Sequence, residues 1–385
     1  MRKKRLLLLF LNLFILLSLT SCWNSKDIQN MAYVTAIGFD YADNQYTTYV
    51  QVLNFSNVAK GEANAMGKNV PNWIGKGTGT TVTESFNSIY ATSQLRLFWG
   101  HVKAIVLSER FLKDIDQVAE TYDMVNRYRE IRYNILLYGT TESMIDIFSQ
   151  KSNLNITPIE SLLAQPSQIY SQRSYILPVY GYKLIASLNE PSGLGILPAL
   201  SIDHNNWFED KKGTSMFRIN GAYFYNEKKY SGYMTAKQLE GFRWMQHKLE
   251  RSPINIPDDK DPAAAIVLQK PKTKIHHYEK DGKVNFDIKI SLLAYVDELI
   301  RNETKENIEK QAGEVIANQI RASFEKGVEI KADVLELGSR LYRMDNTLWE
   351  KQHSKNTFFL TKESLRNVEV KVTLIHSGKY KLKVE

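Results

Sequence analysis

The first 22 residues set the strongest limit on this chain, because they decide in which compartment the rest of it folds. Four basic residues at positions 2–5 precede a largely apolar run at 6–19. That run of about 14 residues matches the apolar part of a secretory signal peptide and is shorter than the roughly 20 residues that a helix needs to span a bilayer. We therefore expect residues 1–21 to be a removable export signal.

Cys22 follows this segment directly and is the only cysteine in the chain. The preceding Leu19-Thr20-Ser21 resembles the lipobox read by lipoprotein signal peptidase, in which small side chains admit the backbone and the thiol receives diacylglycerol. Two acyl chains anchor a protein stably, whereas one holds it only marginally. We expect Cys22 to be the lipid-attachment site, with the protein on the outer face of a membrane. A lone cysteine also excludes an intrachain disulfide.

The net charge of the mature chain is mild. Removing residues 1–21 takes away four basic residues and no acidic one, which lowers the formal charge from +8 to +4. This charge suits a neighbouring anionic leaflet, but it is not the footprint of a nucleic-acid-binding protein. No other apolar stretch approaches the length of a membrane span. We expect a protein that lies on a membrane without crossing it and binds no nucleic acid.

Hairpins alternate with helices along the chain. Strand-like patterns with turn residues between them predict hairpins at 33–54, 216–234 and 274–292, the last around Asp281-Gly282. Helices are expected at 82–93, 109–129, 142–150, 235–249 and 303–326. Five prolines between 153 and 205 favour connecting segments over a sheet there. Regular βαβ repetition is scarce, so we predict a multi-domain α+β fold of mostly antiparallel sheets with packed helices.

We expect three folded units after the signal peptide at 1–21. They are an N-terminal α+β domain at 22–205, a middle hairpin-helix region with a linker at 206–262, and a C-terminal α+β domain at 263–385. The linker is placed at 252–262, where prolines and aspartates gather.

Residues 75–81 resemble a phosphate loop, because their glycines precede the start of a helix. They lack the order Gly-x-x-x-x-Gly-Lys-Ser/Thr, and no clear strand leads into them. We expect a turn before a helix whose first residues are capped by Thr81, with Glu84 at capping-box spacing.

Other chemical candidates are isolated. His101 is expected to be a hydrogen-bonded structural residue, and His276 and His277 occupy adjacent strand positions that face opposite sides, which argues against a shared metal. No nucleophile elbow, His-Glu-x-x-His helix or Cys-x-x-Cys pair is present in the sequence. We expect no enzyme activity, no cofactor and no metal. A cluster of charged residues consists of Arg127, Arg129, Glu130 and Arg132. We interpret it as an ion-pair network or a solvated face, with a ligand site as the alternative.

Several large aromatic residues lie beside expected loops and turns. Most are expected to fill corners of the core, whereas others could anchor a protein partner, since Trp and Tyr dominate interface hot spots. These residues are Trp73, Phe98, Trp99, Trp207, Phe208 and Trp349.

Strings distributed over nearly the whole mature chain resemble the C subunits of spore-germination receptors. The most specific is Arg-Leu-Phe-Trp-Gly-His-Val-Lys at 96–103, and Asn24 departs from the acidic residue that many members carry. The other strings lie at 22–28, 34–40, 77–82, 127–132, 332–338 and 341–343.

The resemblance implies a multi-domain α+β fold and a non-enzymatic, lipid-anchored subunit in the inner membrane of the spore. Its expected partners are two integral-membrane proteins, the A subunit and the permease-like B subunit of a nutrient germinant receptor. We infer a role in assembling or stabilising that receptor.

Two other classes share parts of this pattern. A substrate-binding lipoprotein of an ABC importer has a similar anchor and size but is built from repeated strand–helix units. A lipid-anchored cell-wall hydrolase needs an acid/base or metal constellation, which the sequence does not supply.

Overall fold

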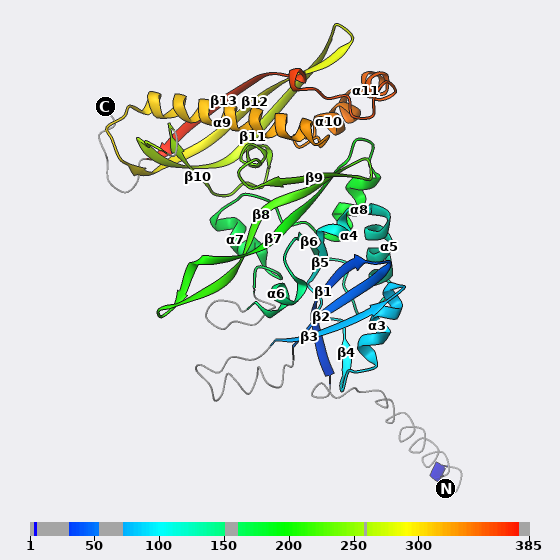
Figure 1. Cartoon of the computed structure of the whole chain (residues 1–385). Coiled ribbons are helices and arrows are strands. Elements are labelled where there is room, and N and C mark those ends of the chain that lie inside the picture. The colour runs from blue at the N-terminus through cyan, green and yellow to red at the C-terminus, as the bar shows by residue number, and fades with distance from the viewer. Residues whose placement is uncertain (1–3, 6–30, 54–71, 151–160, 258–259, 377–385) are drawn as a thin grey trace.

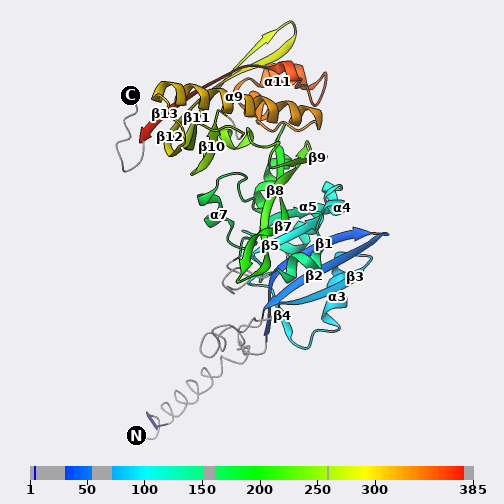
Figure 2. The same ribbon diagram turned by 60° about the vertical axis from the view of Figure 1, so that its left-hand side comes forward.

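The computed structural model describes residues 4–5, 31–53, 72–150, 161–257 and 260–376. Cys22 and the signal segment, apart from residues 4–5, lie outside them. The described residues build two sheets at opposite ends of the molecule (Figures 1 and 2). We call the part around the first sheet the large-sheet lobe and the part around the second the small-sheet lobe.

The described part of the large-sheet lobe holds a nine-stranded sheet in the order β3-β2-β1-β5-β6-β7-β8-β9, with β4 beside β1. Its centre, β1-β5-β6-β7, is parallel, and its flanks are antiparallel. The strands are β1 (Met31–Ala42), β2 (Gln45–Leu53), β3 (Trp73–Gly79), β4 (Arg96–Phe98), β5 (Ala104–Ser108), β6 (Leu136–Thr140), β7 (Leu194–Glu209), β8 (Lys212–Asn226) and β9 (Lys229–Thr235).

Helices cover both faces of this sheet. Side chains alternate along a strand, so Ile37 and Phe39 of β1 enter one apolar cluster while Ala36 enters another on the opposite face. β1 is buried over most of its length for this reason. The helices are α3 (Val82–Tyr90), α4 (Glu109–Leu112), α5 (Ile115–Asn126), α6 (Met144–Ser149), α7 (Pro166–Gln172) and α8 (Gly181–Asn189).

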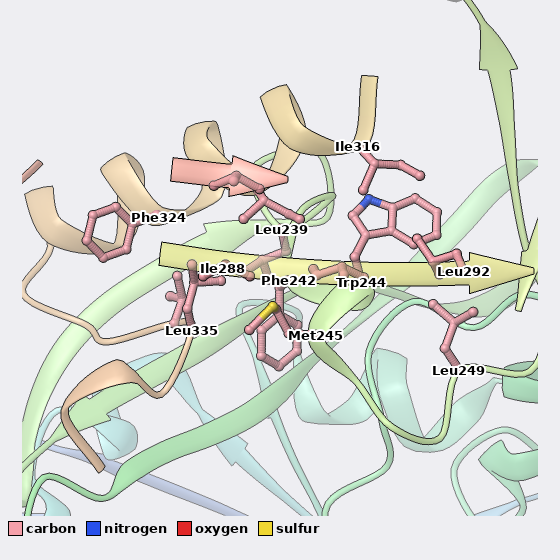
Figure 3. Close-up of a cluster of buried hydrophobic side chains, with 14 of the residues drawn as sticks. Leu239, Phe242, Trp244, Met245, Leu249, Ile288, Leu292, Ile316, Phe324 and Leu335 are labelled. Carbon is pink, nitrogen blue, oxygen red and sulfur yellow. The ribbon is translucent and has the colours of Figure 1, made fainter. Parts of the chain in front are cut away.

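The small-sheet lobe has a four-stranded sheet in the order β10-β11-β12-β13, against which the long helix α9 packs. Figure 3 shows Ile316 and Phe324 of α9 over Ile288 and Leu292 of β12. The elements are β10 (Ser252–Ile256), β11 (Ala264–Lys280), β12 (Lys283–Leu299), α9 (Lys305–Glu329), α10 (Leu337–Met344), α11 (Asn346–His353), β13 (Leu365–His376) and the short 3₁₀ turns η4 (Phe242–Met245) and η5 (Lys362–Ser364).

The predicted α+β class is confirmed, and so are the three hairpins, which are β1–β2, β8–β9 and β11–β12. The sheets are more mixed than expected. Residues that the sequence spaces far apart pair in parallel in the centre of the large sheet, and β13 pairs in parallel with β12.

Four expected segments differ in the structure. The glycine-rich residues 73–79 form β3 and not a turn, and the proline-punctuated region ends in the long strand β7. Residues 235–249 contain the 3₁₀ turn η4 and no α-helix, because the Gly241 N–H donates to Ser323 Oγ of α9 instead of closing a helical turn. The expected linker begins with a paired strand, β10. The domain limits stay a prediction.

The two lobes contact each other through the α10–α11 region. Trp349 Nε1 donates to Ser192 Oγ at 2.7 Å, and Arg343 lies 3.7 Å from the Glu190 carboxylate. His353 contacts Glu227 at the turn between β8 and β9. A single apolar cluster also runs from Ile176 to Val372, so the interface is part of a shared core.

Candidate functional site

The amino ends of four parallel strands meet at one edge of the large sheet. β1 pairs in parallel with β4 and with β5, and β5 pairs in parallel with β6. The register sets Met31 opposite Arg96, and Ala104 opposite Leu136. The segments that lead into these strands, residues 93–103 and 127–135, therefore lie together. We call these two segments the amino edge.

Glu130 joins the two segments of the amino edge. Its Oε2 accepts a hydrogen bond from Trp99 N at 3.1 Å, and its Oε1 accepts one from Arg96 Nη2 at 3.3 Å. The Lys103 backbone completes the connection, since its N–H donates to Thr35 O and its carbonyl accepts from Leu136 N. The string at 96–103 and the charged cluster at 127–132 are therefore joined directly by hydrogen bonds to Glu130.

Aromatic side chains fill the interior of the amino edge. Trp99 is 4% exposed and meets Phe86 and Tyr128 with ring centroids 5.1 and 5.9 Å apart. Tyr33 packs on Phe98 at 5.6 Å and on His101 at 5.1 Å. Trp99 and His101 are therefore parts of a packed core, as expected for a structural histidine. Sequence reasoning placed Trp99 beside a loop, and the structure shows it buried.

Burial and nearby charges shift two titratable groups here. Burial, followed by the charges of Lys103 and Arg132, lowers the pKa of His101 and so favours its neutral form. Burial and the neighbouring Tyr128 raise the pKa of Tyr90. Both shifts favour the uncharged form of the side chain, which suits a structural role.

A groove of 570 Å³ opens on the surface of the amino edge. Its lining is mostly aromatic and aliphatic, with Tyr90, Leu95, Trp99 and Tyr128 among its residues. Arg96 and Arg129 also line it. The Glu130 carboxylate that borders the groove is already engaged by Trp99 and Arg96. The arrangement suits binding more than proton transfer.

The charge of the amino edge is strongly positive. Its two segments hold five basic residues and one acidic residue, Glu130. The expected ion pairs are present in part, because Arg127 pairs with Asp123 and Arg96 with Glu130. Arg129 and Arg132 are exposed and form no ion pair with any described residue.

The other sequence candidates are spread over the molecule. Trp73 is 67% exposed at the start of β3, and Trp207 and Phe208 are exposed near the end of β7. Trp349 is buried at the lobe interface. Cys22 lies outside the described residues. The structure therefore brings none of these aromatics together with the amino edge.

No group of three or more His, Cys, Asp or Glu side chains in the described part of the chain has an arrangement that could bind a metal ion. The His276 and His277 rings are 6.5 Å apart, and His277 Nε2 lies 3.7 Å from an Asp345 oxygen. Among the described helices, none has the length and apolar character needed to cross a membrane.

Comparison with known proteins separates the chain into two family domains. Residues 24–202 match the spore germination protein N-terminal domain, and residues 219–378 match the spore germination B3/GerAC like C-terminal domain. The chain belongs to the germination-receptor C-subunit family.

Relatives in this C-subunit family match over most of their length. Spore germination protein KC of Bacillus subtilis (strain 168) is 21% identical over 372 residues, which cover 90% of each chain. Spore germination protein B3 of the same organism is 23% identical and covers 84% of this chain and 83% of its own. The crystal structure of the GerBC protein aligns with a TM-score of 0.53 and 16% identity, covering 88% of this chain and 96% of that chain. The fold is therefore shared along both lobes.

Sequence reasoning identified the family and the two strings but missed that the strings are neighbours. The sequence reasoning gave Lys103 no role beyond its place in the string at 96–103, and it did not single out Tyr133. A signal for them existed, since an apolar strand, a helix and a second apolar strand between 102 and 138 form a βαβ unit. Such a unit places the amino ends of both strands at one edge.

Proposed function

We propose that the chain is the lipid-anchored, non-enzymatic C subunit of a nutrient germinant receptor in the inner membrane of the spore. In this role it assembles with, or stabilises, the integral-membrane A and B subunits. The observation that carries the proposal is that both family domains are matched, the first within the large-sheet lobe and the second over the small-sheet lobe together with β9 and part of β8.

The proposed anchor would bring the amino edge close to the membrane. About nine residues separate Cys22 from Met31, and an extended chain spans roughly 3.5 Å per residue, so the tether reaches at most about 30 Å. Met31 begins β1 and lies opposite Arg96 of the amino edge. Attachment through Cys22 would hold this edge nearer to the membrane than the small-sheet lobe.

Affinity purification tests the proposal. The tagged chain is isolated from detergent-solubilised spore inner membranes, and two polytopic membrane proteins are expected to co-purify. Cys22→Ala should lower both the recovery of these partners and the rate of nutrient-triggered germination. Ser25→Ala is the matched control, because it changes a nearby small side chain but keeps the thiol. Recovery of the chain alone, or with an ATPase and its permease, would count against the receptor and favour an importer.

A further inference from the structure

We propose that the amino edge is itself a membrane-binding surface that contacts anionic phospholipid headgroups. The inference rests on the proposed attachment through Cys22, which ends close to this edge. Parallel pairing sets Arg96 opposite Met31 and Ala104 opposite Ala36 and Leu136, so Met31, where the tether would end, belongs to the same edge of the sheet as residues 93–103 and 127–135.

The charge of the amino edge matches an anionic leaflet. Arg129 and Arg132 are exposed and pair with no acidic side chain among the described residues, and Lys103 is partly exposed. The positive charges of Lys103 and Arg132 both lower the pKa of His101, so the two side chains lie near the same ring. Each basic side chain held near an anionic surface strengthens binding by roughly fivefold. A lipid anchor combined with such a patch is more stable than either alone.

Exposed tyrosine side chains lie at or beside the amino edge, and tyrosine is a residue that the headgroup region of a membrane favours. Tyr133 is 73% exposed, and its ring meets that of Tyr182 at 5.7 Å. Lys183 lies over the Tyr182 ring at 6.0 Å, and the Gly181 N–H donates to Ile135 O, which holds the start of α8 against the amino edge. Tyrosine is enriched at membrane–water interfaces because its ring is apolar and its hydroxyl is polar.

The exposed tip of the β7–β8 hairpin makes a useful contrast. Trp207 and Phe208 are exposed there, but acidic residues accompany them at 203, 209 and 210 beside Lys211 and Lys212. This tip therefore lacks the net positive charge of the amino edge, although it also exposes aromatic rings. It supplies a matched position for a control.

Vesicle binding of the unlipidated chain tests the surface without the anchor. Residues 23–385 retain every described core residue, the first of which is Met31. This protein is mixed with vesicles of phosphatidylglycerol and phosphatidylcholine, or of phosphatidylcholine alone, and sedimented. We expect binding to the anionic vesicles only, falling steeply as salt rises from 0.05 to 0.5 M, because surface charges are screened.

Charge reversal locates the binding surface. Arg129→Glu with Arg132→Glu should weaken binding to anionic vesicles by more than tenfold. Lys211→Glu with Lys212→Glu makes the same change in net charge at the hairpin tip and should leave the affinity within twofold. Thermal melting checks that both variants fold, and Arg129→Gln with Arg132→Gln replaces the first pair if it does not.

Each outcome separates this inference from the proposed function. Equal weakening by both pairs, or no binding to anionic vesicles, overturns the membrane surface even if the tagged chain still recovers two polytopic partners. If vesicle binding behaves as expected but no partners co-purify, the surface stands and the receptor proposal fails. If Arg129→Glu with Arg132→Glu leaves vesicle binding intact and abolishes partner recovery, the amino edge contacts protein and this inference is wrong.

Discussion

Glu130 shows how one side chain connects segments that lie far apart in the sequence. Its carboxylate accepts from the Trp99 backbone N–H and from the Arg96 side chain, and it is only partly exposed. Hydrogen bonds to a charged group contribute more than neutral ones, whereas an exposed ion pair contributes little. We therefore attribute most of the effect of Glu130 to its bond with the Trp99 backbone.

Replacing Glu130 tests this assignment. Glu130→Ala should lower the free energy of unfolding by about 1–3 kcal/mol, because the Trp99 N–H loses its acceptor. Arg96→Ala, which removes only the exposed ion pair, should cost about 1 kcal/mol or less. Urea unfolding monitored by tryptophan fluorescence measures both values. Equal losses for the two variants would mean that the ion pair carries the interaction.

Asp333 is the buried acid of the small-sheet lobe. It accepts hydrogen bonds from the N–H groups of Leu337 and Gly338 at 2.9 and 2.6 Å, at the start of α10. Burial dominates over these two bonds and raises the pKa of Asp333 to about 7. Between pH about 4 and 7 the folded chain keeps this proton whereas the unfolded chain has released it.

The sign of the resulting pH effect follows from this difference. The folded state binds more protons in this window, so the contribution of Asp333 to stability is fully present below pH about 4 and falls as pH rises towards 7. The Asp333→Asn side chain does not titrate. The unfolding free energy of this variant should therefore fall less steeply than that of the wild type as pH rises from about 4 to 7. Urea unfolding at pH 4.5, 6 and 8 measures it, with the exposed Asp297→Asn as control. Parallel pH curves for wild type and Asp333→Asn would refute the assignment.

At the scale of the element, β3 shows how glycines can build a strand that propensity disfavours. Gly75, Gly77 and Gly79 alternate, so all three point to the face covered by α3. A Cβ on Gly77 would lie 2.1 Å from the carbonyl oxygen of Ser85, which belongs to the helix backbone. The glycines therefore let α3 lie directly on the strand.

Gly77→Ala should destabilise the protein by roughly 1–3 kcal/mol or more, because the helix must move to admit the methyl group. Thr78→Ala is the matched control, since Thr78 is exposed on the other face of the same strand. Thermal denaturation compares the two variants. A Gly77→Ala melting temperature equal to that of Thr78→Ala would show that α3 can shift freely.

The elements divide into those that local sequence predicts and those that tertiary contacts decide. The β11–β12 hairpin was predictable, because Asp281-Gly282 has turn chemistry and both its residues adopt positive φ. The cap of α3 was also predictable, since Thr81 Oγ1 accepts from Glu84 N, and the Glu84 carboxylate also accepts from the Thr80 N–H. Strand β3 was not predictable from local sequence, because it depends on pairing with β2 and on contact with α3.

The candidate site was only half predictable for a related reason. The sequence strings at 96–103 and 127–132 can be found by resemblance, and their charges can be counted. Their contact through Glu130 and Trp99 depends on parallel pairing between strands that are separated by a helical crossover, α4 and α5. Long-range pairing of this kind leaves little trace in local hydrophobic periodicity, so the amino edge emerged only from the structure.

At the scale of the whole molecule, the two lobes behave as one body because they share a core. Leu194 and Phe224 of the large-sheet lobe belong to the same apolar cluster as Phe242 and Leu335, and Figure 3 shows Leu335 near Phe242 and Met245. Trp349 adds a hydrogen bond across the interface to Ser192. The interface therefore combines apolar packing with a directed polar contact.

A double-mutant cycle measures that polar contact. Trp349→Phe and Ser192→Ala should each lower the unfolding free energy by about 1 kcal/mol through the lost hydrogen bond, and the double variant should cost less than their sum. Calorimetry should show one unfolding transition for every variant, because the shared core remains. Additive losses would indicate that the bond does not couple the lobes, and two transitions would contradict the shared core.

The position of β1 has a mechanical consequence. β1 is the first described strand of the sheet, and it has neighbours on both sides, β2 on one and β4 and β5 on the other. A force that a tether at Cys22 transmitted along the axis of β1 would load this strand in shear. Its hydrogen bonds run across that direction, so the bonds on both sides would share the load and rupture together, whereas an edge strand pulled away sideways would lose them one at a time. A chain tethered in this way would resist unravelling from that end under such a force.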